Sequence, residues 1–131
     1  MKLLFGSILL GVACAQESQR PPLQQGVSVQ MPVASHAVEM RSADEQNATV
    51  VAITADGTIY VGIKPTEAAA LSNLSAGTVH VKADSRVPFQ KVLTVLDALH
   101  GRSVVLLSAP PANVGKEKIV PPYGMKLTVS R

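Results

Sequence analysis

The clearest pattern along the chain is a pair of β-branched runs on either side of a turn. Residues 49–55 read TVVAITA and residues 58–63 read TIYVGI. Between them stand Asp56 and Gly57, a dipeptide that favours the tight turn of a β-hairpin. These runs therefore predict two antiparallel strands, and Asp56 and Gly57 are expected to serve the turn rather than any chemistry.

Three further strands follow, each with a different exposure pattern. Residues 78–83 (TVHVKA) alternate, which predicts a half-exposed strand with His80 and Lys82 on its outer side. Residues 103–109 (SVVLLSA) are almost all apolar, which predicts a fully buried strand. Residues 124–130 (GMKLTVS) alternate again and predict a closing strand.

Two helices are predicted between these strands. The first begins after Pro65, with Thr66 as its N-cap and Glu67 in its first turn, and ends at Gly77. The second covers residues 88–100, because apolar residues recur there at helical spacing. The apolar positions of this second helix are Val92, Val95, Leu96 and Leu99.

The order of elements, β-β-α-β-α-β(-β), predicts an α+β domain over residues 49–131. Helices that connect strands imply crossovers, so both helices are expected on one face of a mixed sheet. The other face would then be open or covered by a second subunit.

Residues 16–48 precede this domain and are expected to form a linker. Within it, Val27, Val29 and Met31 alternate with polar residues until Pro32, which suits an edge strand or a strand exchanged between subunits. Exposed strand edges bind extended peptides, so this segment and the closing strand are candidate binding edges. The alternative is that both edges pair within one subunit.

The first fifteen residues have the pattern of a targeting segment. Lys2 precedes the apolar run Leu3–Val12, and residues 13–15 (ACA) resemble a signal-peptide cleavage site. Cleavage before Gln16 would release a chain without cysteine. Two alternatives stay open, namely a lipoprotein leader in which Cys14 is lipidated and a retained short membrane anchor.

Composition and charge remove several classes of function. Aromatic residues make up 3% of the chain, too few for sugar-stacking or single-strand nucleic-acid sites. One cysteine excludes an intrachain disulfide and a multi-cysteine zinc site. Residues 79–131 hold eight basic and three acidic residues, but the basic ones are spread over several predicted elements, so no nucleic-acid partner is expected.

The polar residues that resemble chemistry have structural explanations. His36, His80 and His100 fall on three unrelated elements, so no metal site is expected. Asp84 is expected to accept backbone N–H groups in the turn before the second helix, and Asp97 to lie beside its apolar stripe. The sequence therefore predicts neither an enzyme nor a cofactor.

Three blocks of the chain resemble the periplasmic domain of the ExbD/TolR family of biopolymer-transport proteins. The blocks are residues 50–66, 78–99 and 103–109, and with the upstream segment the resemblance covers residues 23–108. The positions that carry the family pattern are Ala83, Asp84, Val87, Pro88, Phe89, Lys91, Val92, Asp97, Ala98 and Leu99.

The resemblance implies a non-catalytic, homodimeric domain on the periplasmic side of a bacterial inner membrane. Its implied partners are ExbB- and TonB-like or TolQ- and TolA-like proteins, with peptidoglycan as a further ligand. In this family an aspartate in the membrane helix takes part in proton coupling. The run Leu3–Val12 holds no acidic residue, so this chain is expected to lack the proton step.

The candidate partner-binding residues combine the alternating segment with the family motifs. They are Val27, Val29, Met31, Asp84, Arg86, Pro88, Phe89 and Lys91. The alternative function is a cell-wall-binding or envelope-adaptor module, in which Lys116, Lys118 and Lys126 of the basic C-terminal half bind an anionic polymer.

Overall fold

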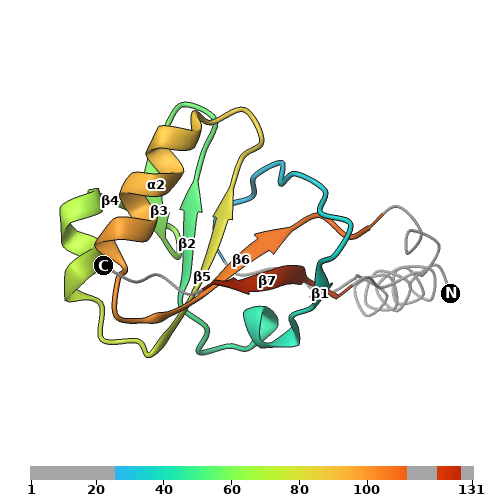
Figure 1. Cartoon of the computed structure of the whole chain (residues 1–131). Helices are drawn as coiled ribbons and strands as arrows, with labels where there is room; N and C mark the ends of the chain where they lie inside the picture. Colours follow the sequence, from blue (N-terminus) through green and yellow to red (C-terminus); the bar gives the residue numbers. More distant parts are fainter. Residues whose placement is uncertain (1–25, 112–120, 128–131) are drawn as a thin grey trace, which may run out of the picture.

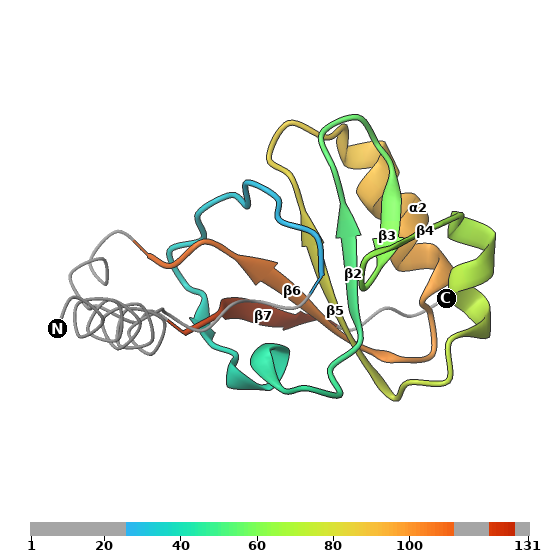
Figure 2. The same ribbon diagram turned by 180° about the vertical axis from the view of Figure 1, so that it is seen from behind.

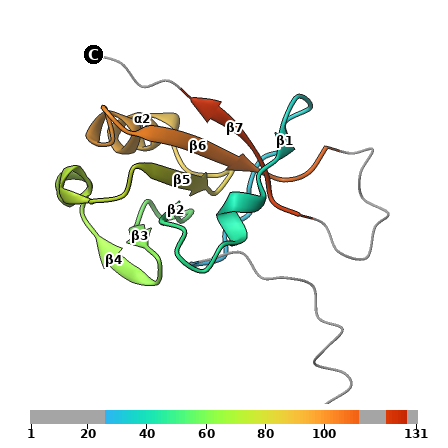
Figure 3. The same ribbon diagram turned by 90° about the horizontal axis from the view of Figure 1, so that it is seen from below.

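A seven-stranded mixed sheet forms the centre of the computed structural model, which describes residues 26–111 and 121–127 (Figure 1). The strand order is β1-β7-β6-β5-β2-β3-β4, with β1 and β4 at opposite ends (Figure 3). The strands are β1 Val38–Glu39, β2 Val50–Ile53, β3 Ile59–Val61, β4 Lys64–Thr66, β5 Thr78–Ala83, β6 Ser103–Ser108 and β7 Tyr123–Leu127. The helices are α2 Phe89–Ala98 and the 3-10 helices η1 Arg41–Asp44 and η2 Ala68–Asn73.

Strands β2, β5 and β6 run parallel, and the remaining pairs are antiparallel. Parallel neighbours need crossover connections, and here η2 and α2 provide them on the same face of the sheet. Leu71 of η2, Val95 of α2 and the α2 C-cap residue Leu99 are fully buried in one cluster with Val81 and Ile53. The predicted α+β class, with two helices on one face, is confirmed.

The predicted hairpin is also confirmed. Strands β2 and β3 pair antiparallel, with Ala52 opposite Tyr60. Gly57 adopts a φ of 88° and donates its N–H to the Thr54 carbonyl at 2.8 Å. Asp56 Oδ1 accepts the Thr58 N–H at 3.1 Å and the Thr54 hydroxyl, so both turn residues have the predicted structural role.

The predicted start of the first helix is wrong. Thr66 does not cap a helix but ends β4, where it lies opposite Ile59 of β3. Glu67 is extended and makes no side-chain capping bond, and only the short 3-10 helix η2 follows it. The residues around Thr66 pair with β3 instead of starting a helix. Strand pairing gives their backbone N–H groups hydrogen-bond partners, whereas the first turn of a helix leaves its N–H groups without any.

The expectation that His80 and Lys82 lie on an exposed side of β5 is wrong as well. Their exposed fractions are only 3% and 2%. On this second face, the side that Figure 2 shows, Met40 and Ala43 from the upstream segment pack against Val105 and Leu107, with Met31 beside them. The second face is therefore covered by this chain's own upstream segment, which the sequence pattern placed in a linker.

Residues 26–32 form no regular strand in the described part of the chain. The nearest approach to pairing is a single parallel bridge between Val33 and Ala109. Val27, Val29 and Met31 are nevertheless half-buried while Ser28 and Gln30 are exposed, so the predicted alternation is present as an alternation of burial.

Strand β7, the predicted closing strand, is not a free edge of the sheet along its whole length, because it has a neighbouring strand on each side. On one side it pairs with β6, and on the other Tyr123 and Gly124 pair with β1. Residues 128–130 of the predicted strand lie outside the described residues.

Candidate functional site

The turn between β5 and α2 holds the densest polar contacts of the candidate residues. Asp84 is 4% exposed, and its carboxylate accepts Arg86 Nε at 2.8 Å and Arg86 Nη2 at 2.9 Å. The Arg86 backbone N–H donates to the same carboxylate at 3.0 Å. These bonds to the Arg86 side chain, followed by the backbone bond, hold the pKa of the Asp84 carboxyl well below its usual range.

The same turn fastens the upstream segment to the domain. The Gln30 N–H donates to Asp84 Oδ2 at 3.2 Å, and the Gln30 carbonyl accepts the Ser85 N–H at 2.8 Å. Two residues further on, the Pro32 carbonyl accepts the Ala109 N–H at 2.9 Å. Residues 30–33 therefore cross the carboxyl ends of β5 and β6.

An apolar groove of about 360 Å³ opens beside this turn. Its lining includes Pro32, Val92 of α2, Leu106 of β6 and Met125 of β7. Phe89 stands at the groove with 71% of its surface exposed. A groove of this size accepts one large apolar side chain, and its mainly apolar lining favours such a side chain over a charged group.

The structure brings only some of the candidate residues together. Asp84 and Phe89 line the groove, Arg86 is bonded to Asp84, and Pro88 takes the N-cap position of α2. Met31 packs on the second face of the sheet with Met40, Ala43, Val105 and Leu107.

Of the eight candidate residues, only Asp84 and Phe89 line the groove, and Val27, Val29, Met31 and Lys91 lie outside its lining. Lys91 lies by the β2–β3 turn, where its Cε would be 3.9 Å from a Cβ placed on Gly57. Val27 follows Gly26, which abuts the Gly62 carbonyl in the β3–β4 turn. Neither Lys91 nor Val27 lines the groove.

Sequence reasoning missed much of the groove lining. Pro32, Ser85, Leu106, Ser108 and Met125 were not among the candidates. One signal could have found part of this set, since carboxyl ends of neighbouring parallel strands meet at one edge of a sheet and often bound a binding crevice. Recognising β5 and β6 as parallel neighbours would have placed Asp84 beside Ser108.

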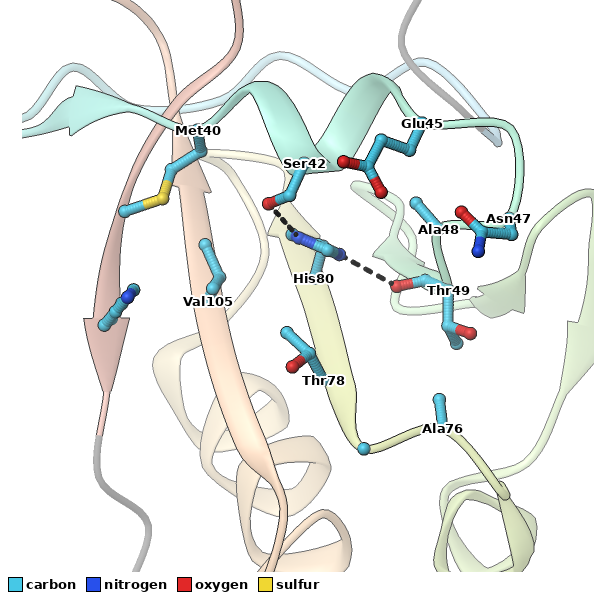
Figure 4. Close-up of a pocket in the computed structure, with 12 residues that line it drawn as sticks. Met40, Ser42, Glu45, Asn47, Ala48, Thr49, Ala76, Thr78, His80 and Val105 are labelled. Atoms are coloured by element: carbon cyan, nitrogen blue, oxygen red, sulfur yellow. Dashed lines mark hydrogen bonds between the residues drawn. The ribbon is translucent and has the colours of Figure 1, made fainter.

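A second, more polar cavity of about 470 Å³ lies on the opposite face (Figure 4). His80 lies against it, with Nε2 at 2.9 Å from Ser42 Oγ and Nδ1 at 3.3 Å from the Thr49 carbonyl. Neighbouring Lys82 is buried, which lowers the pKa of its ammonium group, while the Asp44 carboxylate acts in the opposite direction. The sequence pattern could not predict this cavity, because half of its lining comes from residues 40–49, which were expected to lie in a linker or at the start of a strand.

Neither a metal centre nor a membrane span is found in residues 26–111 and 121–127. No three His, Cys, Asp or Glu side chains gather there in a way that could hold a metal ion. No helix of those ranges is both long and apolar enough to cross a bilayer. Cys14, Lys116 and Lys118 lie outside the described residues.

Comparison with protein-family models matches residues 17–109 to the family described as "Biopolymer transport protein ExbD/TolR". The match spans most of the chain, and the chain belongs to the ExbD/TolR family. The search of curated proteins found no match to it.

Membership of the family supports a coarse assignment of function. ExbD/TolR proteins are components of TonB/Tol-type energy transduction, a transport-associated and non-enzymatic role. They are anchored in the inner membrane, carry a periplasmic domain and associate with ExbB/TolQ-type partners.

Proposed function

We propose that residues 26–131 act as the periplasmic, non-catalytic binding domain of an ExbD/TolR-type transport component. The groove beside Asp84 is the surface that receives a TonB- or TolA-like partner. The proposal assigns the proton step to other subunits, because the apolar run Leu3–Val12 contains no acidic residue.

The observation that carries this proposal is the exposed Phe89 at the apolar groove. A phenyl ring that is 71% exposed, next to a groove lined by Val92 and Leu106, gives a partner both a surface to cover and a cavity to fill. Burying one large apolar side chain contributes about 1.5–3 kcal/mol. Two such contacts would supply much of the affinity of a transient complex.

The Asp84–Arg86 pair supports the proposal because it keeps the groove in shape before binding. Asp84 accepts N–H groups from both Gln30 and Arg86, so one carboxylate connects the upstream segment to the start of α2. A preformed groove binds with a smaller loss of conformational entropy than one that must first be ordered.

Measurement of partner affinity for two variants of α2 tests this assignment. Phe89→Ala removes the exposed ring at the groove, whereas Leu93→Ala changes a side chain on the same helix that is 41% exposed and outside the groove lining. Titration of a TonB- or TolA-like periplasmic domain into the purified chain should show an affinity at least about tenfold weaker for Phe89→Ala, the equivalent of 1.4 kcal/mol. Leu93→Ala should bind like the wild type, and an equal effect of both variants would contradict the proposal.

The proposal also includes export by the first fifteen residues and homodimerisation of the mature chain. Membrane fractionation of cells expressing the wild type and Cys14→Ser separates the possibilities. Loss of membrane association only in Cys14→Ser would indicate lipidation, while release of both proteins to the periplasm would indicate cleavage. Light scattering after size exclusion measures the oligomeric state, and a monomer at all concentrations would contradict the dimer.

Cell-wall binding is the second candidate function, and the exposure of Lys126 on β7 favours it. Purified sacculi should retain the chain in a salt-dependent manner if its basic half binds anionic polymer. Retention that survives replacement of Lys116, Lys118 and Lys126 by Gln would exclude this mode of binding.

A further inference from the structure

Two short segments of the chain match the acceptor pattern for N-linked glycosylation, which is Asn-x-Ser/Thr with any residue except proline at x. They are residues 47–49 (NAT) and residues 73–75 (NLS). The two segments differ in the residue that stands two positions before the asparagine. This residue is Glu45 in the first segment and Leu71 in the second.

Asn47 lies on an exposed turn between η1 and β2 (Figure 4). The Ala48 N–H donates to the Glu45 carbonyl at 3.0 Å, so Asn47 is the third residue of a four-residue turn. Residues 45–47 are exposed, and residues 48–49 are half-buried. An enzyme can therefore reach the Asn47 side chain without opening the sheet.

The segment around Asn73 is also at the surface, but its backbone is held in place. Asn73 is the last residue of η2, and Arg102 Nη2 donates to the Ser72 carbonyl at 2.8 Å. Arg102 Nε donates to the Leu74 carbonyl at 3.2 Å, and Leu71 is fully buried in the core. An enzyme that bound this segment in an extended form would have to break these bonds and expose Leu71.

The charge of Glu45 adds a second difference between the two segments. Glu45 is exposed, so its carboxylate can form a charge-assisted hydrogen bond with a cationic side chain of an enzyme. The corresponding residue before Asn73 is apolar and lies in the core. Accessibility and charge thus both favour Asn47 as the acceptor.

We propose that Asn47 is an N-glycosylation site and that a bacterial oligosaccharyltransferase recognises it together with the Glu45 carboxylate. In the reaction, Asn47 Nδ2 bonds to the anomeric carbon of an oligosaccharide carried on a lipid pyrophosphate. The bond between that carbon and the pyrophosphate oxygen breaks, and the lipid pyrophosphate leaves with the electron pair. Nδ2 loses one proton, which passes to water.

The modification rests on the export included in the proposed function, because this acceptor pattern is used on surface loops of secreted proteins. It is compatible with the proposed partner binding. Asn47 lines the polar cavity and is not part of the groove lining, so a glycan on Asn47 would leave the groove beside Asp84 open.

Incubation of the purified full chain with a purified bacterial oligosaccharyltransferase and a lipid-linked oligosaccharide tests the site, with peptide mass mapping as the readout. The fraction of Asn47 that carries a glycan should exceed that of Asn73 at least about tenfold, a ratio equivalent to 1.4 kcal/mol. Asn47→Gln should abolish glycosylation, and Asn73→Gln should leave it unchanged. Both variants should keep the circular dichroism spectrum of the wild type.

Glu45→Gln tests the role of the charge, because glutamine has nearly the same shape as glutamate but is neutral. It should lower the rate of Asn47 glycosylation at least about tenfold, as expected when a hydrogen bond to a charged group is lost. Glu67→Gln is the matched control, since Glu67 is exposed next to η2 and far along the chain from Asn47. Glu67→Gln should leave the rate unchanged.

Several outcomes would overturn the proposal. They are an unmodified Asn47, equal glycosylation of Asn47 and Asn73, and an unchanged rate in Glu45→Gln. A synthetic peptide of residues 43–51 separates sequence from fold. Glycosylation of this peptide but not of the full chain would show that the fold hides Asn47.

Expression in cells that contain the same enzyme and glycan tests export separately. The full chain should be glycosylated at Asn47, and a chain that begins at Gln16 without the leader should stay unmodified. Modification of the purified chain but not of the full chain in cells would contradict the proposed export while supporting Asn47 as the acceptor.

Discussion

At the scale of single residues, Asp84 has the largest set of structural partners among the candidate residues. It joins the end of β5, the start of α2 and the upstream segment through Arg86 and Gln30. The sequence was sufficient to predict part of this role, since an aspartate just before a helix accepts backbone N–H groups. The bond to Gln30 could not be predicted, because the two residues are 54 positions apart.

The lowered pKa of Asp84 predicts a specific pH dependence of stability. A carboxyl whose folded-state pKa is depressed contributes stability at a pH above its unfolded value of about 3.9, and this contribution is lost as the pH falls through the folded value. Asp84→Asn should therefore lower the free energy of unfolding at pH 7, and the difference from wild type should shrink as the pH is lowered below about 4. Urea denaturation at several pH values measures both effects.

Asp97→Asn is the matched control for that experiment, because Asp97 is exposed near the end of α2. It should leave the free energy of unfolding close to that of the wild type across the same pH range. A constant difference between Asp84→Asn and wild type down to pH 2 would show that Asp84 acts without its charge.

The burial of His80 and Lys82 could not be predicted from the pattern of their own strand. Both alternate with valines on β5, and alternation in an antiparallel or edge strand ordinarily places polar side chains in water. Here residues 40–48 cover them, with Ser42 bonded to His80 and Asp44 close enough to affect Lys82. A covering segment from forty residues upstream leaves no trace in the pattern of the strand itself.

At the scale of elements, strand pairing and packing determined which segments became strands or helices where the local sequence did not. The hairpin and α2 were predictable because a turn dipeptide and a helical apolar stripe are complete within a few residues. Strand β4 was not, since Pro65 and Thr66 carry helix-start signals but pair with β3. The close approach of β7 to β6 could not be predicted either, because it depends on Gly124 of β7, which lies against the backbone of β6.

Gly124 provides the test of packing at this scale. A Cβ at this position would lie 2.6 Å from the Leu106 carbonyl oxygen, a contact that the backbone of β6 must move to relieve. Gly124→Ala should lower the free energy of unfolding by about 1–3 kcal/mol, the usual cost of overpacking. Chemical denaturation measures this value.

Gly77→Ala is the control, since a Cβ there meets nothing within 4 Å. Its effect should stay within about 0.5 kcal/mol, as for ordinary surface substitutions. If both alanine variants have the same stability, the contact between β7 and β6 is looser than the structure indicates.

At the scale of the whole molecule, the sheet is covered on both faces, but by different parts of the chain. Helices η2 and α2 cover one face, and Met31, Met40 and Ala43 of the upstream segment pack on the other. The groove and the polar cavity therefore lie on opposite sides of one sheet.

Removal of residues 1–48 tests how far the upstream segment belongs to the folded unit. This truncation, at the predicted boundary of residue 49, would expose Val105 and Leu107 together with His80 and Lys82. It should lower the thermal midpoint and increase binding of a hydrophobic dye relative to a chain that begins at Gly26. Equal midpoints for the two chains would show that residues 26–48 are dispensable for folding, as expected of a linker.

The central proposal is that the groove beside Asp84 receives a TonB- or TolA-like partner. The most direct measurement is an NMR titration of the isotope-labelled full chain with a TonB- or TolA-like periplasmic domain. The account predicts the largest shift changes at Phe89, Val92, Leu106 and Met125, with little change around His80. Saturable binding whose shift changes fall outside the groove would contradict it.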